Sequence, residues 1–195
     1  MPSCLLGIEA CANANNWARQ FQELGHDARL TPPAYVKPSV GRGAKNDATD
    51  AAATFEAVTN LNMRFVQIKS REDQAFLMLD SARGILVRQR AMAAYAVQAH
   101  LAEYGVTISQ GRHRVDGLNS KLDEMREGLP DDECFALDAL VGQLEALDGQ
   151  IEGIDVRLSE FHQTNQICRL LATISGIGPI TATAFATTVP NPSGF

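Results

Sequence analysis

An unbroken heptad pattern of large apolar residues constrains the fold of this chain more than any other feature. The pattern alternates intervals of three and four residues for more than three heptads, which is typical of a coiled-coil helix. Its members are Leu137, Leu140, Leu144, Leu147, Ile151, Ile154, Leu158 and Phe161. The helix is expected to begin near Pro130, because Asp131, Asp132 and Glu133 follow where a helix amino terminus favours negative charge. Such a seam must be buried against another helix.

The partner of this helix can lie in the same chain or in a second copy. Ser70 is placed to cap another long helix that reaches about Tyr104, with Gly105 as its stop. Folded back through a connection over residues 111–128, this helix would form an antiparallel arm with the seam. A parallel coiled coil with a second copy would bury the seam equally well. The sequence leaves both arrangements open.

Strand and helix patterns alternate in the first third of the chain. Apolar runs predict strands at residues 4–8 and 27–31. Between them, Asn13 and its neighbouring asparagines offer caps for a helix that Gly25 is placed to end. A strand–helix–strand unit of this kind builds a parallel sheet. An alanine-rich helix is predicted over residues 46–59 and a further short strand at residues 65–68.

The last part of the chain contains a glycine-punctuated turn between two short apolar helices. The turn, Gly176-Ile177-Gly178, follows an apolar stretch over residues 168–175 and precedes a helix from Ile180. In a helix-hairpin-helix, such glycines let the backbone approach a DNA phosphate, which the next helix amino terminus binds. Gly176 and Gly178 are therefore candidate DNA-binding residues, and a purely structural turn is the alternative. The expected packing face between the helices comprises Ile174, Ile177, Ala182 and Phe185.

Composition excludes several classes of protein. Apolar residues make up 45% of the 195 residues and charged residues 21%, the balance of a globular rather than a disordered chain. No apolar run approaches the roughly 18 residues needed to cross a bilayer, and the chain does not begin with a secretory signal, so we expect no membrane partner and a cytoplasmic location. The 4 cysteines lack the spacing of a zinc or disulfide framework, so free and mostly buried thiols are expected.

Charge is distributed unevenly around the net value of −6. Basic residues predominate between Arg64 and Arg114, and acidic residues predominate between Asp131 and Glu160. A basic helix beside an acidic one usually means two solvated, mutually attractive faces. A phosphate-binding role for the basic stretch is the alternative.

Three carboxylates are candidates for a metal site. Asp47 and Asp50 lie three residues apart at the start of a predicted helix, so both project from one face. Glu9 ends the first strand, where α/β folds commonly build sites. Three carboxylates would supply the oxygen ligands that Mg2+ requires, and bound Mg2+ promotes phosphodiester chemistry. Lys45 could contact a phosphate there. Helix caps and a surface glutamate are the structural alternative, and from spacing alone they are the commoner one.

Several stretches spread along the whole chain match one family in order. They comprise Gly7–Ala12, Trp17–Arg19, Leu24–His26, Pro33–Pro38, Lys45–Ala51, Arg64–Val66, Leu86–Arg90 and Ile174–Ala182. Together they resemble the DEDD-type bacterial insertion-sequence transposases, relatives of the Piv-type DNA invertases. The ordered set is far more specific than any one of its members.

The resemblance implies a partial RuvC-like, ribonuclease-H-type domain at residues 1–68, a helical coiled-coil region at residues 69–166 and the start of a C-terminal transposase domain at residues 167–195. It implies four acids that bind Mg2+, of which Glu9, Asp47 and Asp50 match the second, third and fourth. It also implies binding to DNA at the element ends and the target, a structured guide RNA, homo-oligomers through the coiled coil, and a serine nucleophile in the C-terminal domain.

The sequence departs from the family pattern near both ends. Residues 1–8 contain no Asp or Glu to serve as the first acid, and Ser175 and Ser193 do not match the context of the serine nucleophile. We therefore expect a chain truncated at both ends that cannot complete transposition alone. The expected fold class is α/β plus α, with an incomplete ribonuclease-H-like sheet, a long antiparallel coiled-coil arm and the start of a helix-hairpin-helix-like domain. The alternative function is a non-catalytic coiled-coil fragment that binds nucleic acid or regulates a transposase.

Overall fold

The computed structural model describes residues 2–36, 47–60, 62–106, 123 and 126–189. Its contacts divide the chain into two compact units. Unit 1 comprises Met1–Gln74 and Phe185–Phe195, and unit 2 comprises Ala75–Ala184. A separate domain at residues 167–195 stays a prediction.

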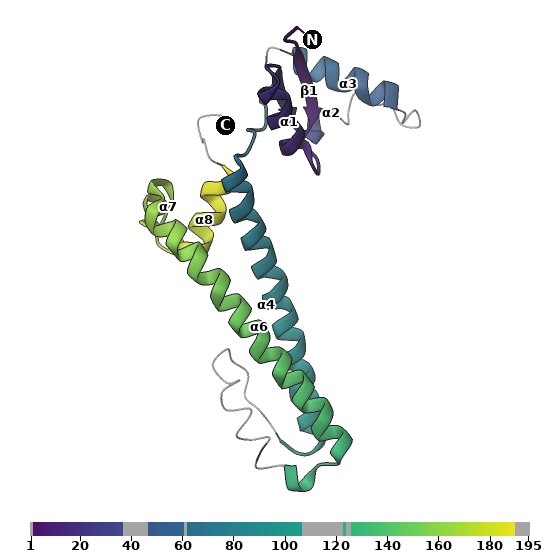
Figure 1. Ribbon diagram of the computed structural model, residues 1–195, viewed down its shortest axis with the longest axis vertical. Coiled ribbons are helices and arrows are strands. Elements are labelled where there is room, and N and C mark those ends of the chain that lie inside the picture. Colours follow the sequence, from purple (N-terminus) through teal and green to yellow (C-terminus); the bar gives the residue numbers. More distant parts are fainter. Residues whose placement is uncertain (1, 37–46, 61, 107–122, 124–125, 190–195) are drawn as a thin grey trace. The chain divides into compact units, whose positions relative to one another are not determined.

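A parallel strand pair forms the centre of unit 1. β1 (Leu5–Glu9) and β2 (Asp27–Thr31) pair with Leu5 opposite Asp27 and Glu9 opposite Thr31. α1 (Ala14–Glu23) connects them, so the predicted strand–helix–strand unit is confirmed (Figure 1). Gly25 follows α1 with a φ of 87°, a conformation that favours glycine. Asn13 stands at the N-cap of α1 with a φ of 70° and makes no side-chain cap, so the cap expected there is wrong.

The two faces of this strand pair carry different helices. Ala28, Leu30 and Ile8 pack with Ala14 and Ala18 of α1 on one face. Successive side chains alternate across a strand, so Gly7 points to the other face, where it lies against α3 (Asp47–Thr59). A Cβ on Gly7 would come within 2.9 Å of the Val58 Cβ, which shows how closely α3 approaches the strand. The short α2 (Pro33–Val36) follows β2 and contacts α3.

The segment after α3 joins the sheet less fully than its sequence predicts. A strand was expected at residues 65–68, but there only Val66 forms a bridge, antiparallel to Leu30. Polar side chains of α1 hold the following residues instead. Asn15 accepts a hydrogen bond from the Lys69 amide at 2.9 Å, and Arg19 donates one to the Lys69 carbonyl at 2.7 Å. These bonds fix the backbone at Lys69, one residue past the expected strand.

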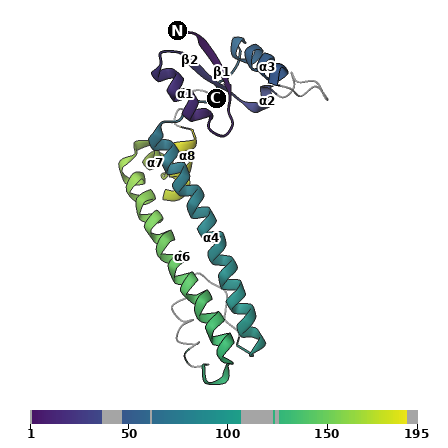
Figure 2. The same ribbon diagram turned by 45° about the vertical axis from the view of Figure 1, so that its right-hand side comes forward.

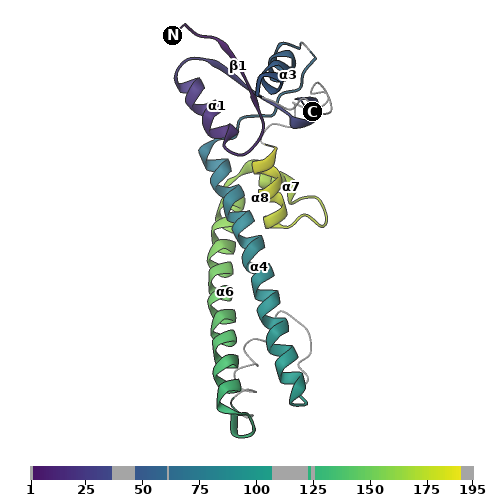
Figure 3. The ribbon, with the colours of Figure 1, turned by 90° about the vertical axis from the view of Figure 1, so that its right-hand side faces the viewer.

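Unit 2 is built on two long antiparallel helices, α4 (Arg71–Glu103) and α6 (Asp131–Thr164), which lie side by side in all three views (Figures 1, 2 and 3). Ser70 caps α4, accepting a hydrogen bond from the Asp73 amide at 2.9 Å. The seam predicted on α6 faces α4: Val97 and Leu101 of α4 form one core cluster with Leu137, Val141 and Leu144 of α6. Five seam residues are buried, namely Leu137, Leu144, Leu147, Ile151 and Leu158. A helix of the same chain therefore covers the seam.

Two ion pairs join the helices at heptad spacing. Arg83 pairs with Asp155, and Arg90, seven residues on, pairs with Asp148, seven residues back. The two arginine side chains are only 16% and 14% exposed. Contact with Asp155 raises the pKa of the Arg83 guanidinium further above its ordinary range. The expected attraction between the basic and the acidic stretch is thus confirmed at these two positions.

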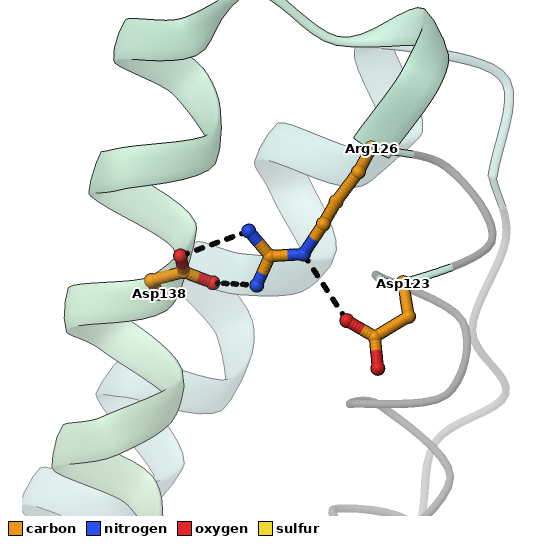
Figure 4. Close-up of polar contacts among 3 residues, drawn as sticks. All are labelled: Asp123, Arg126 and Asp138. Atoms are coloured by element: carbon orange, nitrogen blue, oxygen red, sulfur yellow. Dashed lines mark hydrogen bonds and ion pairs between the residues drawn. The ribbon is translucent and has the colours of Figure 1, made fainter.

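An arginine fixes the turn before α6. Arg126, in the single turn of η2 (Arg126–Gly128), donates two hydrogen bonds to the Asp138 carboxylate at 2.7 and 3.1 Å (Figure 4). Its Nε donates a third to Asp123 at 3.1 Å. A bidentate guanidinium–carboxylate pair has a fixed geometry, so it sets the angle at which the chain enters α6.

Two short helices, α7 (Gln166–Leu171) and α8 (Pro179–Thr188), follow α6. Asn165 caps α7 by accepting a hydrogen bond from the Cys168 amide at 3.0 Å. Fully buried Cys168 lies against Ala182 and Thr183 of α8. The packing face expected from the sequence is therefore partly wrong: Ile174 and Phe185 are 53% and 54% exposed, and the smaller Cys168 and Ala182 make the contact.

The cysteines differ from expectation in their exposure. All four are free, but Cys4 and Cys11 are exposed, Cys134 is half-buried and only Cys168 is buried. The two exposed thiols flank β1 and lie outside the strand itself, so strand packing does not cover them. Within the described residues, no helix combines the length and apolar character that a membrane span requires.

Candidate functional site

Glu9 is the last residue of β1, at the carboxyl end of the strand pair. It stands opposite Thr31, and its carbonyl accepts a hydrogen bond from the Cys11 amide at 2.8 Å in the turn that follows. The side chain is half-buried. Because residues two apart on a strand share a face, Glu9 lies on the same face as Gly7, the face that α3 covers.

Asp47 and Asp50 occupy the first turn of α3, as predicted. They share a helix face with Thr54 and Val58, since the spacings of three and four residues return to one side of a helix. Thr54 and Val58 are the residues that approach Gly7 of β1. The two aspartates therefore lie on the face of α3 that packs on the sheet, with Asp47 exposed and Asp50 half-buried.

The three carboxylates share one side of the strand pair but do not form a metal centre by themselves. Among the described residues, which include all three, no group of three or more His, Cys, Asp or Glu side chains is placed to hold a metal ion. The aspartate pair and Glu9 come from the elements that the sequence predicts. Their convergence on one cation stays a prediction.

Lys45, the predicted phosphate contact beside the aspartates, lies outside the described residues. Other basic side chains divide into two groups. Arg83 and Arg90 are engaged by α6, so they are not available to phosphate. Arg64 and Arg88 are exposed in the described part of the basic stretch.

The glycine turn between α7 and α8 has one residue that requires glycine. Gly176 has a φ of 90°, which other L-residues rarely adopt. Gly178 has no such φ, and a Cβ there would meet nothing within 4 Å. Gly178 is exposed, so its backbone is open to an approaching ligand. Pro179 begins α8 and carries no N–H, which leaves one amide donor fewer at this amino terminus.

Two structural arginines were not singled out from the sequence. Arg19 reaches Lys69, 50 residues away, and Arg126 reaches Asp138, 12 residues away. Neither separation follows a helix or strand period, so no periodic signal marks them. Both hold loops in place; neither contributes a ligand to the carboxylate group.

The sequence of the chain is similar to those of several curated proteins. The chain is 36% identical over its full length to a putative transposase of Sinorhizobium fredii. It is 36% identical over 95% of its length to a probable family 20 transposase of Pseudomonas aeruginosa. It is also 34% identical over 95% of its length to the transposase for insertion sequence element IS1328 of Yersinia enterocolitica. The chain is a homologue of proteins named transposases.

The similarity covers only part of each of these relatives. The chain spans 50% of the Sinorhizobium protein and 55% of the other two, about half the length of the curated relatives it matches. No protein-family model and no solved structure matches the chain. Because the match to the Sinorhizobium protein covers the whole chain, the homology extends through both units, from the strand pair to the glycine turn.

Proposed function

We propose that this chain is part of a DEDD-type insertion-sequence transposase, a protein that binds DNA and recombines it. The observation that carries the proposal is identity of 33–36% over 90–100% of the chain to proteins named transposases. Because those proteins are about twice as long as the matched region, strand transfer is proposed for the whole architecture and not for these residues alone.

Within this architecture, Glu9, Asp47 and Asp50 are proposed as three of four Mg2+ ligands in a RuvC-like domain. Their placement supports this, because Glu9 lies on the sheet face that α3 covers and the aspartates lie on the face of α3 that packs there. Carboxylate oxygens are the donors that Mg2+ prefers. The arrangement does not fit a complete site, however, since no metal-binding group forms among the described residues. No reaction step is therefore assigned to these side chains.

Metal titration tests the role of the carboxylates. Isothermal titration of the chain with Mn2+ or Mg2+ should show a site that disappears in the double variant Asp47→Asn/Asp50→Asn. Asp131→Asn/Asp132→Asn is the matched control, because it removes two aspartates from the first turn of α6 instead. Equal binding by both variants, or none by the unaltered chain, would remove the metal role.

DNA binding is proposed for the turn between α7 and α8, with Gly178 as the residue whose backbone approaches a phosphate. Fluorescence anisotropy should show that duplexes from the element ends bind more tightly than scrambled duplexes, with affinity falling as salt rises. Gly178→Ala should weaken binding several-fold, because it adds a methyl group at the contact while the space around it is open. Gly153→Ala, also in open space but on α6, should not. Binding unchanged by Gly178→Ala would move the contact elsewhere.

The family architecture also includes a guide RNA and assembly into homo-oligomers through a coiled-coil arm, and we propose both here. RNA transcribed from the element ends, used as a competitor in the same anisotropy assay, tests the first. Competition no better than that of an unrelated RNA of equal length would contradict it. Assembly through the arm must use a surface other than the seam of α6, which α4 already covers.

A non-catalytic fragment is the second candidate, and one observation favours it. The described residues contain no metal-binding group, whereas the paired helices α4 and α6 form an extensive apolar core. In that case the chain would bind nucleic acid or a transposase without cutting. The metal titration separates the two candidates, since only the catalytic one requires the carboxylates.

A further inference from the structure

α4 carries a second apolar stripe on the side that faces away from α6. Its members recur at intervals of three and four residues, and every one is exposed. This outer stripe comprises Met78, Ser81, Ile85, Arg88, Met92, Tyr95, Ala99 and Ala102. The large members are far from buried: Met78 is 74% exposed, Met92 71%, Tyr95 61% and Ile85 48%.

The outer stripe is opposite the face that contacts α6. Arg83, Arg90 and Val97 mark the inner face, seven residues apart. The outer residues stand two and five positions after these, which at 3.6 residues per turn places them roughly half a turn away. Apart from Ser81 and Arg88, the outer side of α4 is apolar although it is exposed. The solvent face of a helix usually carries charges, so an exposed apolar stripe of this kind is expected to be covered by a partner.

Arg88 is the only charged residue in the outer stripe. The exposed side of α6 is different, with exposed acids at Asp131, Asp132, Glu152 and Glu160. Two copies of α6 would therefore repel one another if their outer sides met. On the outer side of α4, Arg88 is the only charged residue of the stripe that a second copy would repel.

We infer that α4 pairs with α4 of a second copy of this chain, antiparallel across a two-fold axis between Ile85 and Arg88. Met78 then lies beside Tyr95 of the second copy, and Ser81 beside Met92 of the second copy. The axis falls near the middle of the 33-residue helix, so the two helices overlap over their whole length. A two-fold contact uses the same surface on both copies and closes after two. This inference rests on the assembly part of the proposed function.

The size of this contact sets its strength. A helix of 33 residues is about 50 Å long, and a helix face is about 10 Å wide. The pairing would bury about 1,000 Å² in total, which is near the lower limit for a specific interface. We therefore expect micromolar rather than nanomolar association.

Sedimentation velocity of the full chain across the micromolar range tests the pairing. Ile85→Lys places a positive charge beside Arg88 of the second copy on each side of the two-fold axis, so repulsion should weaken the dimer at least tenfold. Val156→Lys is the matched control, because Val156 is 52% exposed in the middle of α6 and should leave the dimer unchanged. Equal helix content by circular dichroism shows that both variants fold. A chain that stays monomeric throughout, or equal weakening by both variants, would overturn the inference.

Substitution of Arg88 distinguishes this pairing from a contact between α4 and the acidic side of α6 in a second copy. Across the proposed axis the two Arg88 side chains approach one another, so Arg88→Ala should tighten the dimer several-fold. Against acidic α6 the same change would remove an attraction and weaken association. Contact between two different surfaces would also continue beyond two copies. Weakening by Arg88→Ala, or growth beyond a dimer, therefore contradicts the inference.

Cross-linking tests the register directly. In a background with Cys4→Ser, Cys11→Ser and Cys134→Ser, chains carrying Ser81→Cys are mixed with chains carrying Met92→Cys and oxidised. The mixture should form a disulfide-linked heterodimer, because the two positions face one another. Each variant alone should not, since its own mate lies 11 residues along the helix, about 16 Å away. Equal cross-linking in all three samples would exclude this register. These measurements report self-association, so they can fail while metal or DNA binding holds, and the reverse.

Discussion

The strand pair is packed mainly by small side chains, whereas the helical arm is packed by large ones. Among the described residues, the fully buried members of the two clusters in the sheet unit are alanines and Leu30, with Ile8, Val66 and Ile68 packed partly buried against them. The cluster between α4 and α6 consists of leucines and valines. Stabilisation by burial scales with apolar area, so each contact in the arm contributes more than each contact around the sheet.

The two units therefore differ in how they are stabilised. Small side chains let α1 and α3 approach the strands closely, as the contact of Gly7 with Val58 shows. A two-stranded sheet is marginal alone, and here it depends on helix packing and on hydrogen bonds such as that from Arg19 to Lys69. The candidate carboxylates thus belong to the weaker unit, and the stronger unit carries none of them.

The largest expected effect is in the arm. Leu144→Ala removes a side chain that is 1% exposed at the centre of the cluster, and should destabilise the arm by about 2–5 kcal/mol. Urea unfolding followed by far-ultraviolet circular dichroism measures it, because α4 and α6 contribute most of the helix. Fluorescence of Trp17, the only tryptophan, follows the sheet unit in the same samples.

Phe135→Ala is the control for this prediction. It lies on the same helix but is 78% exposed, so its loss should change stability little. If Leu144→Ala shifts the Trp17 transition as much as the helical one, the two units unfold as one, and the comparison between them does not hold.

A smaller effect is expected in the sheet unit from Gly7→Ala. The added Cβ would stand 2.9 Å from the Val58 Cβ, so α3 must move, at a cost of about 1–3 kcal/mol. The change should appear in the Trp17 transition. Gly149→Ala, which meets nothing within 4 Å on α6, should instead stabilise the arm by up to about 1 kcal/mol. An unaltered Trp17 transition in Gly7→Ala would show that α3 yields freely.

Periodic elements were the ones that the sequence predicted well. β1, α1, β2, α3, α4 and α6 all appear within a residue or two of their expected bounds. Each has a repeated apolar spacing or a marked end, such as Ser70 before α4 and Gly105, with a φ of 78°, after it. Local signals of this kind depend only on a few adjacent residues, so they hold whatever tertiary contacts the rest of the chain makes.

Contacts between distant residues were not predictable in the same way. The seam of α6 fits a helix of the same chain or of a second copy, and only the three-dimensional arrangement selects α4. The strand expected near Val66 has the right residues but forms one bridge, to Leu30, and the bonds from side chains of α1 to the Lys69 backbone join residues that no local pattern relates. Likewise, the spacing of Asp47 and Asp50 predicts a shared helix face, but it does not predict their distance from Glu9, which lies on another element.

The ion pairs of the two units should differ in their effect. Arg83 is 16% exposed, so Asp155→Ala leaves a shielded guanidinium that has lost its hydrogen-bonded partner and keeps only the electrostatic attraction of Asp80. Since Asp155 itself is 35% exposed, we discount the value for a fully buried pair and expect a loss of about 1–2 kcal/mol. In the sheet unit, Asp27→Ala breaks an exposed pair with Arg29 and should have no measurable effect.

A double-mutant cycle completes this test. Arg83→Met combined with Asp155→Ala should cost less than the sum of the single changes, because the unpaired charge is gone. Additive costs in urea unfolding would mean that the pair contributes through packing of the long arginine side chain and not through charge.

The smallest effect concerns the buried thiol between α7 and α8. Burial raises the pKa of the Cys168 thiol above its ordinary value of 9.0. In the unfolded chain the thiol ionises at about that ordinary value, whereas in the folded chain it stays protonated to higher pH. Its contribution to stability is therefore fully present below pH 9.0 and declines as the pH rises above it. The urea midpoint should fall more between neutral and alkaline pH in the unaltered chain than in Cys168→Ala. Parallel pH profiles for the two proteins would mean that Cys168 ionises as easily when folded as when unfolded, and that its contact with Ala182 and Thr183 opens readily.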